Sequence, residues 1–253
     1  MSKEGDNGAV ATAALVGAVG GAGTTRLSVE TGAMLARDGR RVAVFDAAFD
    51  TQGLARYVDG RIDTDATDLV TGEEVTPAAA MLEYPTAGPG ELLLCPAHAP
   101  FADVAEAKST AAARRLETTV REAGVAFDTV LVDAPPVASN PSVAAVTAAD
   151  RVAVVAPGTD RGVDGVQTQR ARLADVDAGA DVVVATRTAD PPGVADVAVP
   201  ESDVTGAARA PVADDGDGPF AAAVAEFAER LFGVDLDVEF EEPGLVDRAL
   251  PGR

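Results

Sequence analysis

The chain has 253 residues, a length that suits one large α/β domain or two small ones. Hydrophobic residues make up 47% of it, enough for a self-sufficient core, and 41 acidic against 20 basic residues give a formal net charge of -21. Such a charge argues against binding to nucleic acid or to an anionic membrane.

The composition also points to a compartment and an environment. The polar start Met1–Gly8 lacks the pattern of a signal peptide, and no apolar run reaches the ~18 residues of a membrane span, so we expect a cytoplasmic protein. Lysine occurs only twice, at positions 3 and 108. A surface crowded with carboxylates and nearly free of lysine resembles proteins of halophilic archaea, where it serves solubility. The single cysteine, Cys95, excludes an internal disulfide and lies in an apolar run, which predicts a buried thiol.

Apolar runs of strand length alternate with segments of helical spacing. The predicted strands, in chain order, are 9–16, 41–45, 91–95, 129–132, 151–156, 181–185 and 197–199. The predicted helices are 25–37, 53–58, 65–70, 77–82, 105–123, 162–176, 202–209 and 219–232. This alternation indicates an α/β fold: a doubly wound, mostly parallel sheet with helices on both faces.

One domain accounts for most of the chain. We predict a flexible N-terminus at 1–8, a single domain at 9–233, and a C-terminal tail at 234–253 that is acidic and then contains Pro and Gly. We expect the tail to be an exposed extension.

The turn after the first predicted strand is rich in glycine. Glycines stand at positions 17, 20, 21 and 23, directly before a predicted helix. Glycines let backbone amides wrap an anion, and the helix start adds the positive end of its dipole. The first βα turn of a doubly wound sheet is also a usual ligand position. The pattern therefore predicts a phosphate-binding loop.

One family that uses such a loop does not fit. The glycines at 17, 21 and 23 match the spacing of short-chain dehydrogenases, and Asp46 follows the second strand where a ribose would bind. Catalysis in that family needs Tyr-x-x-x-Lys. The two tyrosines, at 57 and 84, are followed four positions later by Arg61 and Gly88, so the proton-transfer residues are absent.

A second family fits over nearly the whole chain. From about Val10 to Gly233 the sequence resembles the MinD/ParA P-loop ATPases, whose loop reads Lys-Gly-Gly-x-Gly-Lys-Thr-Thr. Gly20-Gly21-Ala22-Gly23 occupies the Gly-Gly-x-Gly positions, and Asp133 in "DTVLVDAPP" resembles the Walker B acid. The segments 149–152 and 197–209 resemble further family elements in the same order.

The resemblance implies a ligand and its contacts. The ligand is ATP or ADP with Mg²⁺. The implied nucleotide-binding residues are Gly20, Gly21, Ala22, Gly23, Thr24, Thr25, Arg26 and Arg187. The implied metal ligands are Thr25, Asp133 and Asp46, and Asp46 is also the one candidate catalytic residue. A homodimer and an unidentified protein partner are expected by the same analogy.

The departures from the family pattern carry functional information. The two family lysines are replaced by Val19 and Thr24, and the second acid of the Asp-x-Asp switch is Ala48. The asparagine that usually reads adenine falls at Thr186, before Arg187. Because phosphoryl transfer depends on positioning and charge neutralisation, we predict a non-hydrolysing or very weak ATPase. Its role would be that of a regulatory or positioning partner in cell division, chromosome partitioning or assembly localisation.

Two alternatives stay open at this point. In one, the chain is a slow ATPase in which Arg26 replaces the lysine. In the other, it is an interaction module that binds no nucleotide. Val19 removes the lysine that crosses the dimer in this family, which argues against nucleotide-driven dimerisation. The acidic tail lacks the basic amphipathic helix by which MinD proteins lie on membranes.

Overall fold

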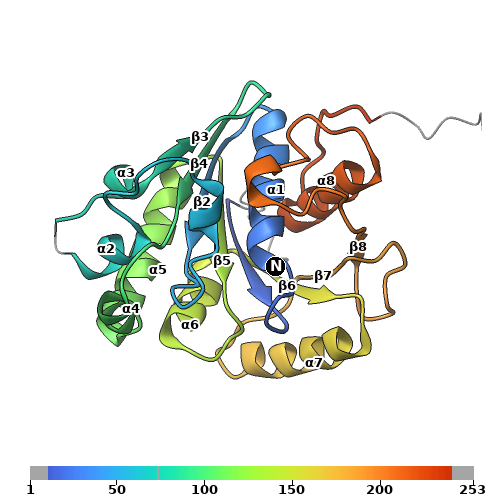
Figure 1. Ribbon diagram of the computed structural model, residues 1–253. Helices are drawn as coiled ribbons and strands as arrows, with labels where there is room; N and C mark the ends of the chain where they lie inside the picture. Colours follow the sequence, from blue (N-terminus) through green and yellow to red (C-terminus); the bar gives the residue numbers. More distant parts are fainter. Residues whose placement is uncertain (1–10, 73, 241–253) are drawn as a thin grey trace, which may run out of the picture.

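The computed structural model describes residues 11–72 and 74–240 and consists of an eight-stranded sheet flanked by helices (Figure 1). The strand order is β3-β4-β2-β5-β1-β6-β7-β8, and every neighbouring pair is parallel except β3 with β4. The strands are β1 (Thr12–Gly17), β2 (Arg41–Asp46), β3 (Leu82–Tyr84), β4 (Glu91–Cys95), β5 (Thr129–Ala134), β6 (Arg151–Pro157), β7 (Val182–Thr186) and β8 (Val197–Val199).

Helices cover both faces of this sheet. The α-helices are α1 (Thr24–Arg37), α2 (Ala66–Thr71), α3 (Pro77–Ala80), α4 (Phe101–Ala107), α5 (Thr110–Ala126), α6 (Asn140–Ala148), α7 (Asp160–Ala174) and α8 (Pro219–Phe232). Two short 3₁₀ helices are η1 (Leu54–Tyr57) and η2 (Ala207–Arg209). The predicted doubly wound, mostly parallel fold is confirmed.

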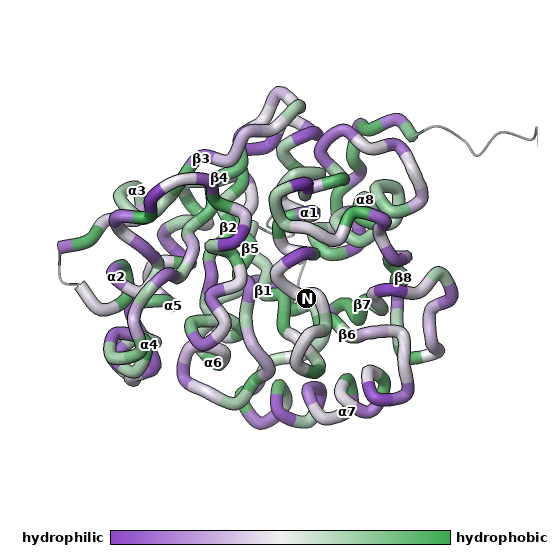
Figure 2. Tube along the Cα trace, in the orientation of Figure 1, coloured by the Kyte–Doolittle hydropathy of each residue, from purple (hydrophilic) through white to green (hydrophobic). Residues whose placement is uncertain are grey.

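The core has two layers, one on each side of the sheet. Residues of α1 and α8 pack on one face, and residues of α2, α5, α6 and α7 pack on the other. All six residues of β1 and of β5 are buried, as expected for parallel strands covered on both sides, and the strands are mostly apolar in Figure 2. Gly32 lets α1 approach closely, because a Cβ there would lie 2.8 Å from Leu92 Cδ1.

Four local predictions need correction. The long helix predicted at 105–123 is two helices, because the chain leaves the helix at Lys108 and Ser109 caps α5 by accepting from the amide of Ala112. The helix predicted at 202–209 is reduced to η2. Helix α6 was not predicted, because its small apolar residues show no amphipathic period. The segment 77–82 holds only the short α3, followed by the edge strand β3.

The start of the tail packs on the domain. Alternate residues of 234–240 lie against the core layer that contains α1 and α8, namely Val234, Leu236, Val238 and Phe240. The expectation of an exposed extension is therefore wrong for this part. The predicted flexible residues 1–8, and the tail beyond 240, lie outside the described residues. Among the described helices, none combines the length and the apolar character needed to cross a bilayer.

Candidate functional site

The glycine loop between β1 and α1 has an open conformation. Gly21 and Gly23 have φ values of 75° and 94°, in the left-handed region that glycine adopts without strain. Within the described residues, the amides of Gly20, Gly21, Gly23, Thr24 and Thr25 donate to no protein acceptor, and the residues themselves line one cleft. The loop therefore offers a run of uncommitted backbone donors to an anion.

The start of α1 adds to this attraction. Gly23 is its N-cap and supplies no side-chain acceptor, and no acidic residue stands in the first turn. The first amides of a helix lack partners inside the helix and carry its positive dipole end. Because no side chain satisfies them here, an anion in the cleft is the natural acceptor.

A carboxylate and a hydroxyl meet beside the loop. Asp133 is the penultimate residue of β5, which pairs with β1, and it lines the same cleft as Thr25. Burial, and then the charge of Asp46, raises the pKa of Asp133 from 3.8 to about 8, while a hydrogen bond from the Thr25 hydroxyl opposes this shift. Oδ2 of Asp133 is buried and has no hydrogen-bond partner among the described residues. This orphaned oxygen and the Thr25 hydroxyl are ligands of the kind that Mg²⁺ prefers.

Asp46 lies behind this pair, at the end of β2 and opposite Asp133 in the strand register. Its Oδ1 accepts from the amide of Ala48 at 2.9 Å and its Oδ2 from the amide of Leu54 at 3.2 Å. Burial raises the pKa of Asp46 from 3.8 to about 6, against the lowering effect of these two amides. Its oxygens thus hold the following segment in place, and Asp46 is not part of the lining of the cleft.

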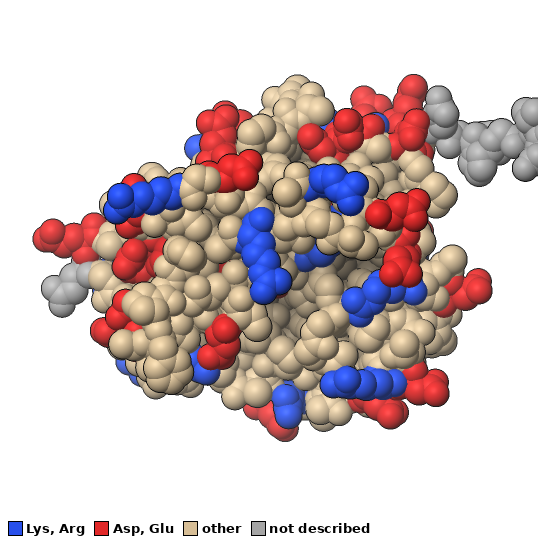
Figure 3. Space-filling view, viewed as in Figure 1, with Lys and Arg blue, Asp and Glu red and all other residues tan. Residues whose placement is uncertain are grey.

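The cleft is large enough for a polyphosphate and its charge suits one. It has a volume of about 500 Å³, and among its lining residues two arginines, Arg26 and Arg56, face one acid, Asp133. In Figure 3, Lys and Arg side chains surround a central hollow, whereas most acidic side chains lie toward the rim. The balance is notable because the chain as a whole has about twice as many acidic as basic residues. Electrostatic focusing in such a cleft favours an anion.

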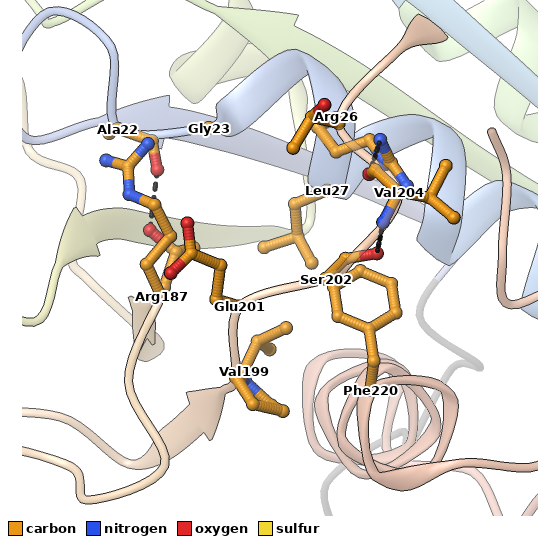
Figure 4. A pocket seen from close by; sticks show the side chains of 13 residues that line it. Ala22, Gly23, Arg26, Leu27, Arg187, Val199, Glu201, Ser202, Val204 and Phe220 are labelled. Carbon is orange, nitrogen blue, oxygen red and sulfur yellow. Dashed lines mark hydrogen bonds between the residues drawn. The ribbon is translucent and has the colours of Figure 1, made fainter. Parts of the chain in front are cut away.

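A second pocket, of about 280 Å³, adjoins the first and shares four lining residues with it: Ala22, Gly23, Arg26 and Thr205. Arg187 donates from Nη2 to the Gly21 carbonyl at 2.8 Å, and the Thr186 hydroxyl donates to the Ala22 carbonyl at 2.7 Å. The residues after β7 are therefore held against the loop, as Figure 4 shows for Arg187 beside Ala22 and Gly23. Arg187 has φ 57°, a conformation that non-glycine residues rarely adopt and that often marks functional sites.

Arg26 is directed toward the second pocket. Its Nε pairs with the fully buried Glu30 one turn later, and its Nη1 donates to the Val204 carbonyl at 3.1 Å. The guanidinium also lies over the Phe220 ring, 5.9 Å from its centroid (Figure 4). Glu30 in turn accepts from the amides at 212 and 213, so this pair joins α1 to the C-terminal part of the domain. To act on a phosphate in place of lysine, Arg26 would have to leave this pair.

Val19 and Thr24, at the two lysine positions, lie against other parts of the domain. A Cβ on Gly165 of α7 would lie 2.8 Å from Val19 Cγ1, so the Val19 side chain is directed at that helix. The Thr24 hydroxyl lies 3.0 Å from where a Cβ on Gly17 would be, and it closes over the end of β1. Neither position supplies a cation.

Three features of the site were missed by sequence reasoning. Glu30 is four residues after Arg26 on a predicted helix, and this spacing was a readable signal for the ion pair. Arg56 lies on a segment that was predicted helical but given no role, and Phe220 comes from the last helix. Only the fold brings the latter two to the loop.

The fold and loop together define the class of protein. A parallel sheet with a glycine loop between a central strand and a helix, and with an acid at the end of the neighbouring strand, is the P-loop NTPase arrangement. A sequence profile of the family described as "AAA domain" matches residues 10–179, more than half of the chain, and the chain belongs to that family.

Solved structures of MinD proteins and of a cobyrinic acid a,c-diamide synthase share the fold. The septum site-determining protein MinD of Pyrococcus horikoshii OT3, complexed with Mg-ADP, aligns with a TM-score of 0.72 at 18% identity, covering 87% of this chain and 94% of that one. A chain of the MinC:MinD cell division protein complex of Aquifex aeolicus aligns with a TM-score of 0.72 at 22% identity, covering 90% and 98%. Cobyrinic acid a,c-diamide synthase of Mycobacterium smegmatis, with bound ATP analog and magnesium, gives 0.65 at 20%, covering 87% and 93%. Among curated proteins, none is similar enough to count as a match.

Proposed function

We propose that this chain binds ATP or ADP with Mg²⁺ and serves as a MinD/ParA-like regulatory or positioning partner that hydrolyses ATP very weakly or not at all. The observation that carries the proposal is the set of uncommitted amides of Gly20, Gly21, Gly23, Thr24 and Thr25, beside the orphaned Oδ2 of Asp133. These groups suit the phosphates and the metal respectively. Thr25 and Asp133 would hold Mg²⁺, which neutralises phosphate charge when bound.

The adjoining pocket suits the base of the nucleotide. Leu27, Val199 and Phe220 give it apolar walls, and Arg187 stands at the edge nearest the glycine loop. A flat aromatic ring gains from such walls, while the polar edge orients it. The two pockets meet at their shared lining residues, which include Ala22 and Gly23. One nucleotide could therefore place its phosphates over the loop and its base in the second pocket.

Weak or absent hydrolysis follows from what the loop lacks. Val19 and Thr24 supply no charge to the phosphoryl oxygens, and Ala48 cannot position a water as a carboxylate does. Removing one preorganised electrostatic group from an active site costs about 3–4 kcal/mol, or roughly 10²–10³ in rate. Binding is less affected, because the backbone donors remain.

The cellular part of the proposal rests on fold similarity to MinD proteins. We place the chain in cell division, chromosome partitioning or localisation of an assembly, with an unidentified protein partner. A homodimer is part of this proposal, but its formation would not depend on a lysine at position 19.

The test measures binding and turnover separately in molar KCl. Fluorescent ATP and ADP analogues, displaced by unlabelled nucleotide, should bind saturably and more tightly with Mg²⁺, while phosphate release stays near background. Thr25→Val removes the metal-facing hydroxyl with little change in shape, and it should weaken Mg²⁺-dependent binding by about tenfold. Thr118→Val, on the exposed face of α5, is the matched control and should change nothing.

Two outcomes would defeat the proposal. The absence of saturable, Mg²⁺-dependent binding would favour the interaction module without nucleotide. Turnover at the usual rate of MinD-type ATPases would show that the lysines are not needed here.

A further inference from the structure

A polyphosphate in the cleft beside the glycine loop would need a cation to neutralise its charge. The two lysine positions, now Val19 and Thr24, do not provide one. Two arginines line the cleft. Arg26 is engaged by the buried Glu30 and by the Val204 carbonyl. Arg187, in the adjoining pocket, is bonded to the Gly21 carbonyl. This leaves Arg56, whose side chain is exposed at the cleft and forms no ion pair within 11–72 and 74–240.

The backbone that carries Arg56 is fixed against Asp46 and Thr25. Leu54, at the start of η1, is fully buried in the core, and its amide donates to Asp46 Oδ2. Gly53 lies so close to Thr25 that a Cβ on it would be 2.8 Å from the Thr25 hydroxyl oxygen. Because η1 has about three residues per turn, Arg56 is on a different side from Leu54 and lines the cleft.

Granted nucleotide binding as proposed above, we infer that Arg56 is a phosphate-binding residue that supplies the positive charge lost with the two lysines. A guanidinium forms bidentate, charge-assisted hydrogen bonds with phosphate oxygens, and a direct pair of this kind survives molar salt better than a distant one. The cation thus comes from the segment after β2 rather than from the loop after β1.

The experiment compares ligands that differ in phosphate number. Binding of ATP, ADP, AMP and inorganic tripolyphosphate is measured in molar KCl with Mg²⁺ by calorimetry and by competition, for wild type, Arg56→Ala and Arg56→Lys. We expect Arg56→Ala to weaken ATP and tripolyphosphate binding by about tenfold or more, ADP by less, and AMP not at all. Arg56→Lys should recover part of the loss.

The matched control is Arg170→Ala, an exposed arginine of α7 whose loss should leave all four affinities unchanged. An equal loss for ATP, ADP and AMP would show a structural role and overturn the inference. Unchanged ATP binding in Arg56→Ala would overturn it while the proposed function stands. If the wild type binds none of the four ligands, both fail together.

Discussion

Replacing Asp133 with asparagine tests the buried acid pair at the centre of the site. Asp46 and Asp133 are both fully buried, lie side by side on β2 and β5, and form no ion pair within the described residues. Asparagine keeps the shape and an oxygen for the Thr25 hydroxyl, but it removes one charge. We expect Asp133→Asn to make the metal-free protein more stable at pH 8 and to abolish stabilisation by Mg²⁺ and nucleotide.

The sign follows from the direction of the pKa shifts. Both carboxyl groups have folded-state pKa values above the unfolded value of 3.8, Asp46 at about 6 and Asp133 at about 8. Folding is therefore unpenalised below pH 3.8, and the penalty grows as the pH rises until both groups are ionised. Between pH 5 and pH 8 the penalty grows by about one pKa unit for Asp46 and by nearly three for Asp133. At about 1.4 kcal/mol per unit, the wild type should lose on the order of 5 kcal/mol of unfolding free energy over this range.

Urea unfolding in molar KCl, at pH 5, 6, 7 and 8 and without metal, measures this slope. The difference in slope between the wild type and Asp133→Asn isolates the contribution of the buried pair. Asp133→Asn should flatten it, whereas Glu122→Gln, on the exposed face of α5, should leave it as in the wild type. A wild type whose stability is constant or rises from pH 5 to pH 8 would refute the reasoning.

Two further predictions concern groups that are bonded or buried inside the domain. Arg26→Ala should lower the free energy of unfolding by about 3 kcal/mol in urea titrations, because it leaves Glu30 charged and buried, whereas Arg230→Ala breaks an exposed pair of the same spacing and should cost less than about 1 kcal/mol. Loss of nucleotide binding and turnover in Arg26→Ala at unchanged stability would instead support Arg26 as the substitute for lysine. Cys95, fully buried and with its pKa raised by burial, should not react with a thiol reagent until the protein unfolds; labelling at the native rate of an exposed thiol would contradict this.

Sequence reasoning could predict what local pattern and strand order decide. The glycine loop is contiguous, and its chemistry is visible in four glycines before a helix. Thr25 and Asp133 are far apart in the chain, yet they meet because each follows or ends one of two adjacent parallel strands. Arg187 reaches the loop for the same reason, from the end of β7.

The orientation of long side chains was beyond such reasoning. An arginine in the first turn of α1 can face either the cleft beside the glycine loop or the protein interior. Its direction depends on Glu30 and on Val204, which comes from a distant segment of the chain. The helix predicted at 202–209 failed for a related reason. Ser202, Val204 and Thr205 of that segment line part of the second pocket, and the Val204 carbonyl accepts from Arg26 of α1. Such long-range contacts override local helix propensity.

The groups that this chain keeps and the two lysines that it lacks would act at different stages of a phosphoryl transfer. On the proposed function, the loop amides, Thr25 and Asp133 would contact phosphates and metal before any bond changes, whereas a lysine would follow the charge that develops in the transition state. On this proposal, the absence of the lysines should lower the hydrolysis rate more than the affinity. The buried pair of Asp46 and Asp133 also favours binding. Without a cation the pair destabilises the folded domain at neutral pH, and a bound cation would remove this penalty. On the proposed function, occupancy of the cleft would itself be the signal, since it stabilises the segment from Asp46 to η1 on which Arg56 is carried.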